Sequence, residues 1–158
     1  MTGSIVGLFS APNGGVPKAS VDSLGVTNEG CIGDKQNDRA SHGGPQRAVC
    51  LLCTEIMEEL QAEGHPIDGG TTGENLLIRG IDRDELKEGT VLKTSDVTLR
   101  ITRDATPCRT IQDSFIDNNY AIFSHRIIPN RTRWYAEVIQ EGTLSVGEAI
   151  SIVSTNTL

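Results

Sequence analysis

Hydrophobic and polar residues alternate along much of the second half of the chain, with the two-residue period of a β-strand. In the segment 97–102, Val97, Leu99 and Ile101 fall on one face and polar side chains occupy the other. The stretch 13–27 is polar, contains glycine and proline, and is expected to be a loop or a hairpin. Alternation, or a short β-branched run between turn residues, predicts strands at 4–9, 47–52, 75–78, 91–94, 97–102, 134–140 and 149–153.

One segment has the period of a helix instead. Ile56, Met57 and Leu60 form the apolar stripe of a helix predicted over about 55–63, with Thr54 as its N-cap and Gly64 at its end. The segment 113–124 is less regular, and helical turns are compatible with it. Many short strands with one clear helix predict a mainly β fold, a closed or nearly closed β-barrel with a few short helices.

Length and composition narrow the class of protein. The 158 residues predict a single domain over 1–158, without an internal repeat or a linker. A net charge of -7 and an aromatic content of 4% disfavour nucleic-acid binding. No apolar run approaches the ~18 residues of a membrane span, and the first ten residues do not resemble a secretory signal. Four cysteines without an export signal predict reduced thiols in a cytoplasmic protein.

The densest polar segment is 33–47, which has two acids, three cations and one imidazole around a Gly-Gly-Pro turn. Backbone N–H groups of the glycines can bind an anion, and the cations can add charge-assisted contacts. The residues that offer such contacts are Lys35, His42, Gly43, Gly44 and Arg47. The alternative interpretation is a solvated loop whose charges pair with one another.

A second glycine-rich turn, 69–75, resembles a phosphate-binding loop only loosely. It lacks the Gly-Lys-Ser/Thr ending of a P-loop and leads into a predicted strand, so nucleotide hydrolysis is disfavoured. The alternative is a tight connection in which Glu74 and Asn75 bond to the backbone.

Two cysteine patterns carry possible chemistry. Cys108 lies between Pro107 and Arg109, and nearby arginines favour the reactive thiolate, although a free cysteine is more often a small buried residue. Cys50 and Cys53 form a Cys-x-x-Cys pair with leucines between them. Zinc binding would need a second pair with matching spacing, so core packing is the favoured interpretation.

Taken in order, these segments resemble the MOSC domain, which is named for the C-terminal part of molybdenum cofactor sulfurase. The similarity extends from about Ile5 to Val153, and it depends on the order and spacing of several short pieces. The pieces are Gly33-Asp34, Asp38, His42-Gly43-Gly44-Pro45, Arg47-Ala48-Val49, Gly73-Glu74-Asn75-Leu76, Pro107-Cys108, Trp134-Tyr135-Ala136, Gly142 and Gly147.

The resemblance implies a MOSC-type β-barrel of mixed strands with a pocket for the molybdenum cofactor, an anionic molybdenum–pterin group. It makes Cys108 the expected catalytic residue, as a metal ligand or a sulfur carrier, and Asn75 a residue that orients the ligand or a loop. The residues it places at the cofactor are Lys35, His42, Gly43, Gly44, Arg47, Asn75 and Arg109.

Three departures from the family pattern bear on these implications. The family often has Pro-Arg shortly before Pro-Cys, whereas this chain has 103–106 with Asp104, whose negative charge opposes thiol activation. The chain resembles a stand-alone form, so we expect neither the pyridoxal-phosphate-dependent domain of full sulfurases nor pyridoxal phosphate as a cofactor. We likewise expect it to lack the N-terminal extension of the amidoxime-reducing relatives.

The leading hypothesis is therefore a protein that binds molybdenum cofactor through Cys108 and supports reduction of N-hydroxylated compounds, with electrons from a separate redox protein. A second hypothesis is a sulfur carrier, in which Cys108 receives a persulfide from a donor protein and passes it on. A third is a non-catalytic module that binds an anionic metabolite. A structural zinc protein that uses Cys50 and Cys53 is the fourth. None of these involves nucleic acid or a membrane.

Overall fold

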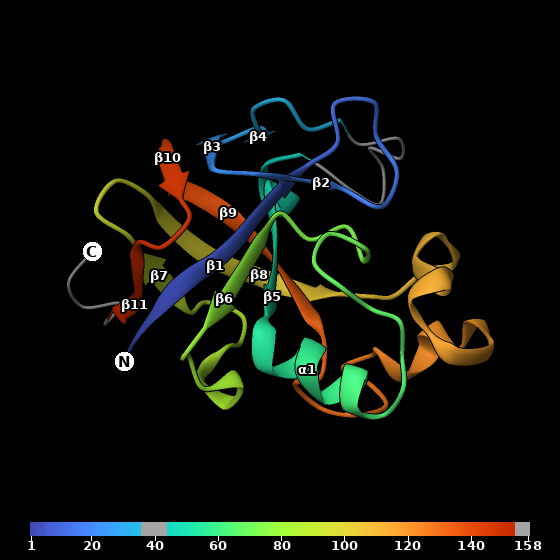
Figure 1. Cartoon of the computed structure of the whole chain (residues 1–158). Helices are drawn as coiled ribbons and strands as arrows, with labels where there is room; N and C mark the ends of the chain where they lie inside the picture. Colours follow the sequence, from blue (N-terminus) through green and yellow to red (C-terminus); the bar gives the residue numbers. More distant parts are fainter. Residues whose placement is uncertain (36–43, 154–158) are drawn as a thin grey trace.

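Seven strands close into a barrel, and an eighth strand extends it along one edge (Figure 1). The structure, a computed structural model, describes residues 1–35 and 44–153. In pairing order the barrel strands are β11 (Ala149–Val153), β7 (Val91–Lys93), β8 (Thr98–Ala105), β9 (Arg133–Gln140), β5 (Val49–Cys53), β6 (Leu76–Arg79) and β1 (Thr2–Ser10). The barrel closes where β11 pairs with the first residues of β1, on the edge of β1 opposite β6. The last residues of β1 pair on that same edge with the eighth strand, β2 (Ala19–Val21).

The strands of the barrel are mixed in direction. β5 and β6 are parallel, while their other neighbours pair antiparallel. A smaller antiparallel sheet is formed by β10 (Gly142–Ser145), β3 (Ser23–Thr27) and β4 (Gly30–Cys31). The prediction of a mainly β, closed barrel of mixed strands with a few short helices is confirmed. The stretch 13–27 is not a hairpin, because β2 pairs with β1 and β3 pairs with β10 and β4.

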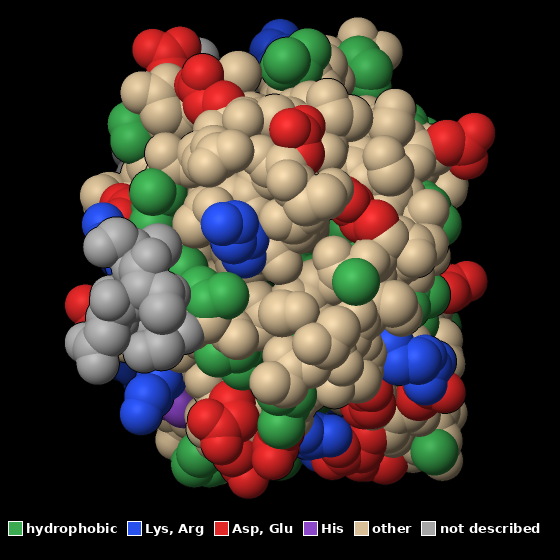
Figure 2. Space-filling view, turned by 90° about the vertical axis from the view of Figure 1, so that its left-hand side faces the viewer, with side chains coloured by type: hydrophobic (Ala, Val, Ile, Leu, Met, Phe, Trp, Pro, Cys, Tyr) green, Lys and Arg blue, Asp and Glu red, His purple; other side chains and the backbone are tan. Residues whose placement is uncertain are grey.

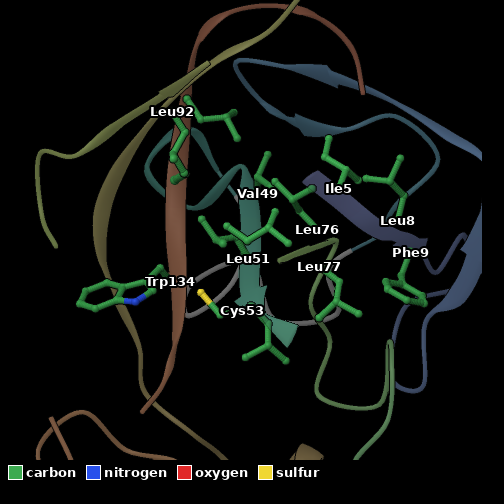
Figure 3. Packing of buried hydrophobic residues seen from close by; sticks show 14 of the residues in the cluster. Ile5, Leu8, Phe9, Val49, Leu51, Cys53, Leu76, Leu77, Leu92 and Trp134 are labelled. Carbon is green, nitrogen blue, oxygen red and sulfur yellow. The ribbon is translucent and has the colours of Figure 1, made fainter. Parts of the chain in front are cut away.

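The barrel core is built from alternate residues of its strands. Val49 and Leu51 of β5 point into the barrel, where they pack with Ile5, Leu76 and other aliphatic side chains (Figure 3). The next residue along, Cys50, belongs to a separate buried cluster with Ala105 and Tyr135. The wall formed by β5, β8 and β9 therefore has two buried faces, one toward the core and one toward segments packed outside it.

The helix α1 (Thr54–Ala62) lies at one end of the barrel and buries the predicted stripe of Ile56, Met57 and Leu60 (Figure 1). The predicted cap is wrong, because Cys53 takes the N-cap position and Thr54 is the first helical residue. Its buried hydroxyl has no hydrogen-bond partner among the described residues. The reason is that β5 runs directly into α1, which leaves no loop residue to provide the cap.

Apart from α1, the helical segments of the structure are short 3-10 turns, and they include the segment 113–124 for which helical turns were expected. The turn η1 (Pro45–Arg47) delays the start of β5 to Val49, two residues later than predicted. Beyond β8 the chain forms η3 (Arg109–Ser114), η4 (Ile116–Asn118) and η5 (Tyr120–Ile122), and this segment lies beside the barrel (orange in Figure 1). A further turn, η2 (Arg83–Glu85), precedes β7.

The described residues form no helix long and apolar enough to cross a membrane. On the face shown in Figure 2, acidic side chains form separate groups with lysine and arginine side chains between them.

Candidate functional site

The candidate site is built on the outer face of β5, β8 and β9. Cys50 pairs with Tyr135 across the β5–β9 register, and Ala105 pairs with Arg133 across the β8–β9 register. All four residues are buried although they point away from the barrel core. Segments outside the barrel therefore cover this face, and their contacts define the site.

Asn75 connects these outer segments to the barrel. Its Nδ2 donates to Asp34 Oδ2 at 2.8 Å and to the Phe9 carbonyl at 3.2 Å, and its Oδ1 accepts from the Cys50 N–H at 3.1 Å. The side chain is fully buried and its polar atoms bond to the protein. Of the two predicted roles for Asn75, orienting a loop is the one these contacts favour.

Asp34 forms a buried ion pair that the sequence did not indicate. Its Oδ2 accepts from the Lys18 ammonium at 2.7 Å, with 5% and 3% of the two side chains exposed, and its Oδ1 accepts from the Ala11 N–H at 2.8 Å. Lys18 lies in a polar stretch where a lysine is normally solvated, so only the fold reveals the partner of Asp34. The pair joins the loops before β2 and after β4.

The glycine-rich turn 69–75 is a tight connection, which was one of the two interpretations of its sequence. The buried Glu74 carboxylate accepts from the Gly70 N–H and from the Thr72 hydroxyl, each at 2.8 Å. Burial raises the pKa of Glu74, while these hydrogen bonds and the positive charge of Arg133 oppose that rise. The backbone of this turn is thus organised by its own carboxylate.

Arg133 is a buried cation that the sequence analysis missed. Its Nη1 donates to the Thr72 carbonyl at 2.7 Å, its Nη2 donates to the Ala105 carbonyl at 3.4 Å, and its guanidinium lies over the Phe123 ring. Within the described residues no carboxylate lies within ion-pair distance of it. An arginine on the same strand face as Tyr135, in a mostly apolar strand, was the available signal.

Cys108 is the cysteine whose thiol is not buried. It occupies the N-cap position of η3, and its Sγ lies 2.7 Å from the Thr110 hydroxyl. Burial raises the pKa of Cys31 and of Cys53 to about 12, and it also raises the pKa of Cys50. Among the four cysteines, Cys108 alone is placed to react with a molecule from solution.

The Cys-x-x-Cys pair is a packing feature, as favoured from the sequence. Cys50 and Cys53 are both buried, and their spacing of three on a strand directs them to opposite faces of the sheet. The described residues contain no group of three or more His, Cys, Asp or Glu side chains placed to hold a metal ion. These observations argue against the structural zinc hypothesis.

Tyr135 is a buried phenol on β9 with the guanidinium of Arg47 over its ring. The Arg47 guanidinium is 5.8 Å from the centre of the Tyr135 ring. Burial is the main cause that raises the pKa of the Tyr135 phenol; a negative charge on Cys50 or Cys108 would add to the rise, and the positive charges of Arg133 and Arg47 oppose it. The charges of Arg47 and of an ionised Cys108, which are 61 positions apart in the sequence, thus both bear on the pKa of the same phenol.

The remaining predicted residues are placed as follows. Lys35 is exposed beside Asp34, and its N–H donates to the Ala11 carbonyl at 3.0 Å. Gly44 precedes η1 with a φ of 80°, a backbone conformation that favours glycine. Arg109 is exposed at the start of η3. His42 and Gly43 lie outside the described residues, so their predicted roles stay predictions.

A separate hollow of about 390 Å³ lies at the start of α1. It is lined by Cys53, Glu55 and the segment 80–83, and it contains none of the candidate residues. The positive side chain in its lining, Arg83, is paired with Glu59 at 2.6 Å. The hollow is therefore not part of the site around Tyr135.

The fold and the site together define a class: a closed mixed barrel whose outer wall has a buried tyrosine beneath an arginine, with a half-buried thiol shortly after β8. Residues 38–151 match the model of the MOSC domain. The chain belongs to the MOSC domain family, which is associated with binding of molybdenum cofactor.

Relatives and solved structures agree with this assignment. The chain is 26% identical to YflK of Bacillus subtilis over 125 residues, which are 77% of this chain and 55% of YflK. It is 24% identical to YiiM of Escherichia coli over 158 residues, which are 97% of this chain and 70% of YiiM. The matched region thus spans little more than half of YflK.

Two crystal structures show the same fold. The YuaD protein from Bacillus subtilis superposes with a TM-score of 0.77 at 21% identity, over 95% of this chain and 94% of that one. YiiM from Escherichia coli superposes with a TM-score of 0.72 at 21% identity, over 98% of this chain and 70% of that one.

Proposed function

We propose that the chain binds molybdenum cofactor with Cys108 as a ligand of the metal, and that it supports reduction of N-hydroxylated compounds. The observation that carries this proposal is the position of Cys108. Its thiol is the accessible one of the four, and it shares the surroundings of Tyr135 with Arg47. Family membership suggests the class of cofactor, and the accessibility of Cys108 supports its role as the ligand.

The side chains present fit such a group. A thiolate suits a metal that is already bound to sulfur, and a guanidinium suits the anionic groups of a phosphate-bearing pterin. Arg133 adds a buried positive charge behind Tyr135, where no described carboxylate pairs with it. Because the described residues hold no cluster of metal-ligating side chains, the other ligands of the metal would come with the cofactor.

Each residue of the site has a defined part in this proposal. Cys108 would hold the metal, and Arg47 and Arg109 would contact anionic groups of the cofactor. Tyr135 stays a neutral phenol because burial raises its pKa, so it adds no negative charge beneath an anion. Asn75 and Asp34 hold the surrounding loops in place. These contacts bind and orient, and they require no covalent change in the protein.

The proposed reduction needs an electron donor and protons, and no other reactant. An N-hydroxyl compound takes up two electrons and two protons and becomes the N–H compound and water. When bound, the cofactor supplies the two-electron redox chemistry. A separate redox protein supplies the electrons, and we propose that it docks where Cys108 is accessible.

A sulfur carrier is the second candidate, and the half-exposed thiol of Cys108 favours it too. In that function a donor persulfide transfers its outer sulfur to the Cys108 thiolate, the donor thiolate leaves, and the sulfur later passes to an acceptor. This function needs an accessible thiol but no metal. The metal content of the protein therefore separates the two candidates.

The test is the molybdenum content of the protein, measured by elemental mass spectrometry after purification from a host that makes the cofactor. Cys108→Ala is compared with Cys53→Ala, which removes a thiol from the core side of the wall. We expect near-stoichiometric molybdenum in the wild type and in Cys53→Ala, and loss in Cys108→Ala. N-hydroxylated substrates are then tested with a reducing partner.

Other results would favour the other functions. Metal-free protein that releases thiocyanate on treatment with cyanide, with no release from Cys108→Ala, would support the sulfur carrier. Binding of an anionic ligand that Cys108→Ala leaves intact, with no turnover, would support the non-catalytic module.

A further inference from the structure

The guanidinium of Arg133 connects the two loops that border the site. Its Nη1 donates to the Thr72 carbonyl of the glycine-rich turn at 2.7 Å. Its Nη2 is shared between the Ala105 carbonyl at 3.4 Å and the Thr106 carbonyl at 3.5 Å, where β8 ends. Arg133 itself is 3% exposed. A buried cation thus bonds to backbone on both sides instead of to a carboxylate.

The Thr106 carbonyl is closely coupled to Cys108 through Pro107. The carbonyl carbon of Thr106 is bonded to the proline nitrogen, and the proline ring fixes the next φ angle. The residue before a proline is also restricted to extended conformations. Few soft dihedral angles therefore separate the atom that Arg133 holds from the backbone of Cys108.

The other contacts of Arg133 keep its orientation fixed. The guanidinium carbon lies 5.7 Å from the centre of the Phe123 ring, and Phe123 is fully buried after η5. Its Nε is buried and has no hydrogen-bond partner among the described residues. Because Nε makes no hydrogen bond, the orientation of the Arg133 guanidinium is set by the carbonyls that its Nη atoms contact. The unpaired Nε donor costs stability.

We propose that Arg133 is a positioning residue for Cys108: it holds the Thr106 carbonyl, and through Pro107 the Cys108 loop, against the turn that contains Glu74 and Asn75. The proposal rests on the proposed function for the importance of Cys108, but not for the contact itself. Arg133 touches neither the cofactor nor a substrate in this account, and it acts through the position of the thiol.

The test uses the alkylation of cysteines by iodoacetamide in folded, metal-free protein, followed by intact mass spectrometry. Cys108 is expected to react first, because the other three thiols are buried. Arg133→Gln should raise the rate at Cys108 about tenfold, the factor expected from losing a charge-assisted hydrogen bond that restrains the loop. Arg133→Lys retains the charge and a donor, so its rate should stay nearer to that of the wild type.

Arg131→Gln is the matched control. Arg131 is also buried and lies two residues away on the chain, but it pairs with Glu63 of the region after α1 at 2.7 Å. Both Gln variants should lower the melting temperature, whereas Arg131→Gln should leave the Cys108 rate unchanged. Alkylation of the three buried cysteines in the same sample reports global unfolding, so a selective change at Cys108 isolates the loop.

Equal rates at Cys108 in the wild type and in Arg133→Gln would overturn the proposal, as would an equal rise in Arg131→Gln. If Arg133→Gln does not fold, Pro107→Ala tests the same coupling with Arg133 in place. It should raise the Cys108 rate by a smaller factor, and an unchanged rate would contradict the coupling. A selective change at Cys108 in a protein that never holds molybdenum would support the positioning role and refute the proposed function.

Discussion

Asp34 accepts hydrogen bonds from an ammonium, an amide and a backbone N–H, and its side chain is almost wholly buried. Asp34→Asn would leave the buried Lys18 ammonium without a carboxylate. We expect a loss of about 3–5 kcal/mol in the free energy of unfolding, the cost of breaking a buried ion pair from one side. Urea unfolding measures it, and Arg79→Gln is the control.

Arg79 pairs with Glu58 at 2.6 Å, but about half of each side chain is exposed. Breaking that pair should cost less than about 1 kcal/mol, because water screens it. Similar losses in Asp34→Asn and Arg79→Gln would contradict the view that the loops around the site depend on a buried pair.

Glu74 gives the protein a specific pH dependence. Its pKa is raised in the folded state from its ordinary value of 4.5, mainly by burial. The stability linked to this raised pKa is present below the unfolded value and is lost as pH rises through the folded value. Glu74→Gln cannot ionise and so does not lose this stability. The free energy of unfolding of Glu74→Gln, relative to that of the wild type, should therefore increase as pH rises above the pKa of Glu74 in the unfolded chain.

Urea unfolding of both proteins between about pH 4 and about pH 8 measures this difference. A difference that stays constant across that range would show that the Glu74 carboxyl is not perturbed by folding.

The thiols offer a third prediction at the scale of single residues. Burial holds Cys31 and Cys53 as thiols with pKa values of about 12, and Cys50 is buried as well. Iodoacetamide should therefore modify the native chain once, at Cys108, and all four cysteines after denaturation. Peptide mapping by mass spectrometry checks it, and rapid modification of a second cysteine in native protein would refute it.

At the scale of elements, the closure of the barrel depends on a small residue in β1. Gly3 pairs with Ile150 of β11, and a Cβ atom at this position would meet the Arg79 carbonyl of β6. Because that neighbour is backbone, it cannot move aside easily. Gly3→Ala should lower the free energy of unfolding by about 1–3 kcal/mol, the usual cost of overpacking.

Val6→Ala changes the exposed side of the same strand, where 39% of the residue is accessible, and should have an effect within about 0.5 kcal/mol. Thermal or urea unfolding compares the two variants. Gly3→Ala that is as stable as the wild type would mean that β1 can shift without opening the barrel.

The elements could be predicted from the sequence because their pattern is local. The alternation at 97–102 and the stripe of Ile56, Met57 and Leu60 each indicate an element without knowledge of its neighbours. The N-cap was predicted wrongly, since the cap depends on whether a loop or a strand precedes Thr54. Local patterns did not show that β5 leads directly into α1.

The candidate site could be predicted only in part, for the same reason. The pieces of the family pattern pointed to Arg47, Asn75 and Cys108. The fold puts Arg47 over Tyr135 and bonds Asn75 to Cys50 of β5, while the predicted role of Cys108 stays a prediction. Lys18 and Arg133 escaped notice because their partners are distant in sequence. The bond from Arg133 to the Thr72 carbonyl spans 61 positions, and it follows from barrel closure rather than from any motif.

At the scale of the whole molecule, the charge of the site differs from that of the chain. The net charge is -7, yet the surroundings of Tyr135 contain Arg47 and the buried Arg133. Short distances and burial make local cations outweigh a distant negative excess that salt screens. The negative net charge is therefore compatible with the anionic cofactor that we propose.

The most direct test of the central claim, that Cys108 is a ligand of the metal, is molybdenum X-ray absorption spectroscopy of loaded protein. Wild type and Cys108→Ser are loaded in parallel, since serine keeps the size of the side chain but offers oxygen. We predict that the metal loses one sulfur neighbour in Cys108→Ser. The same sulfur environment in both proteins, or a wild-type chain that takes up no molybdenum, would contradict it.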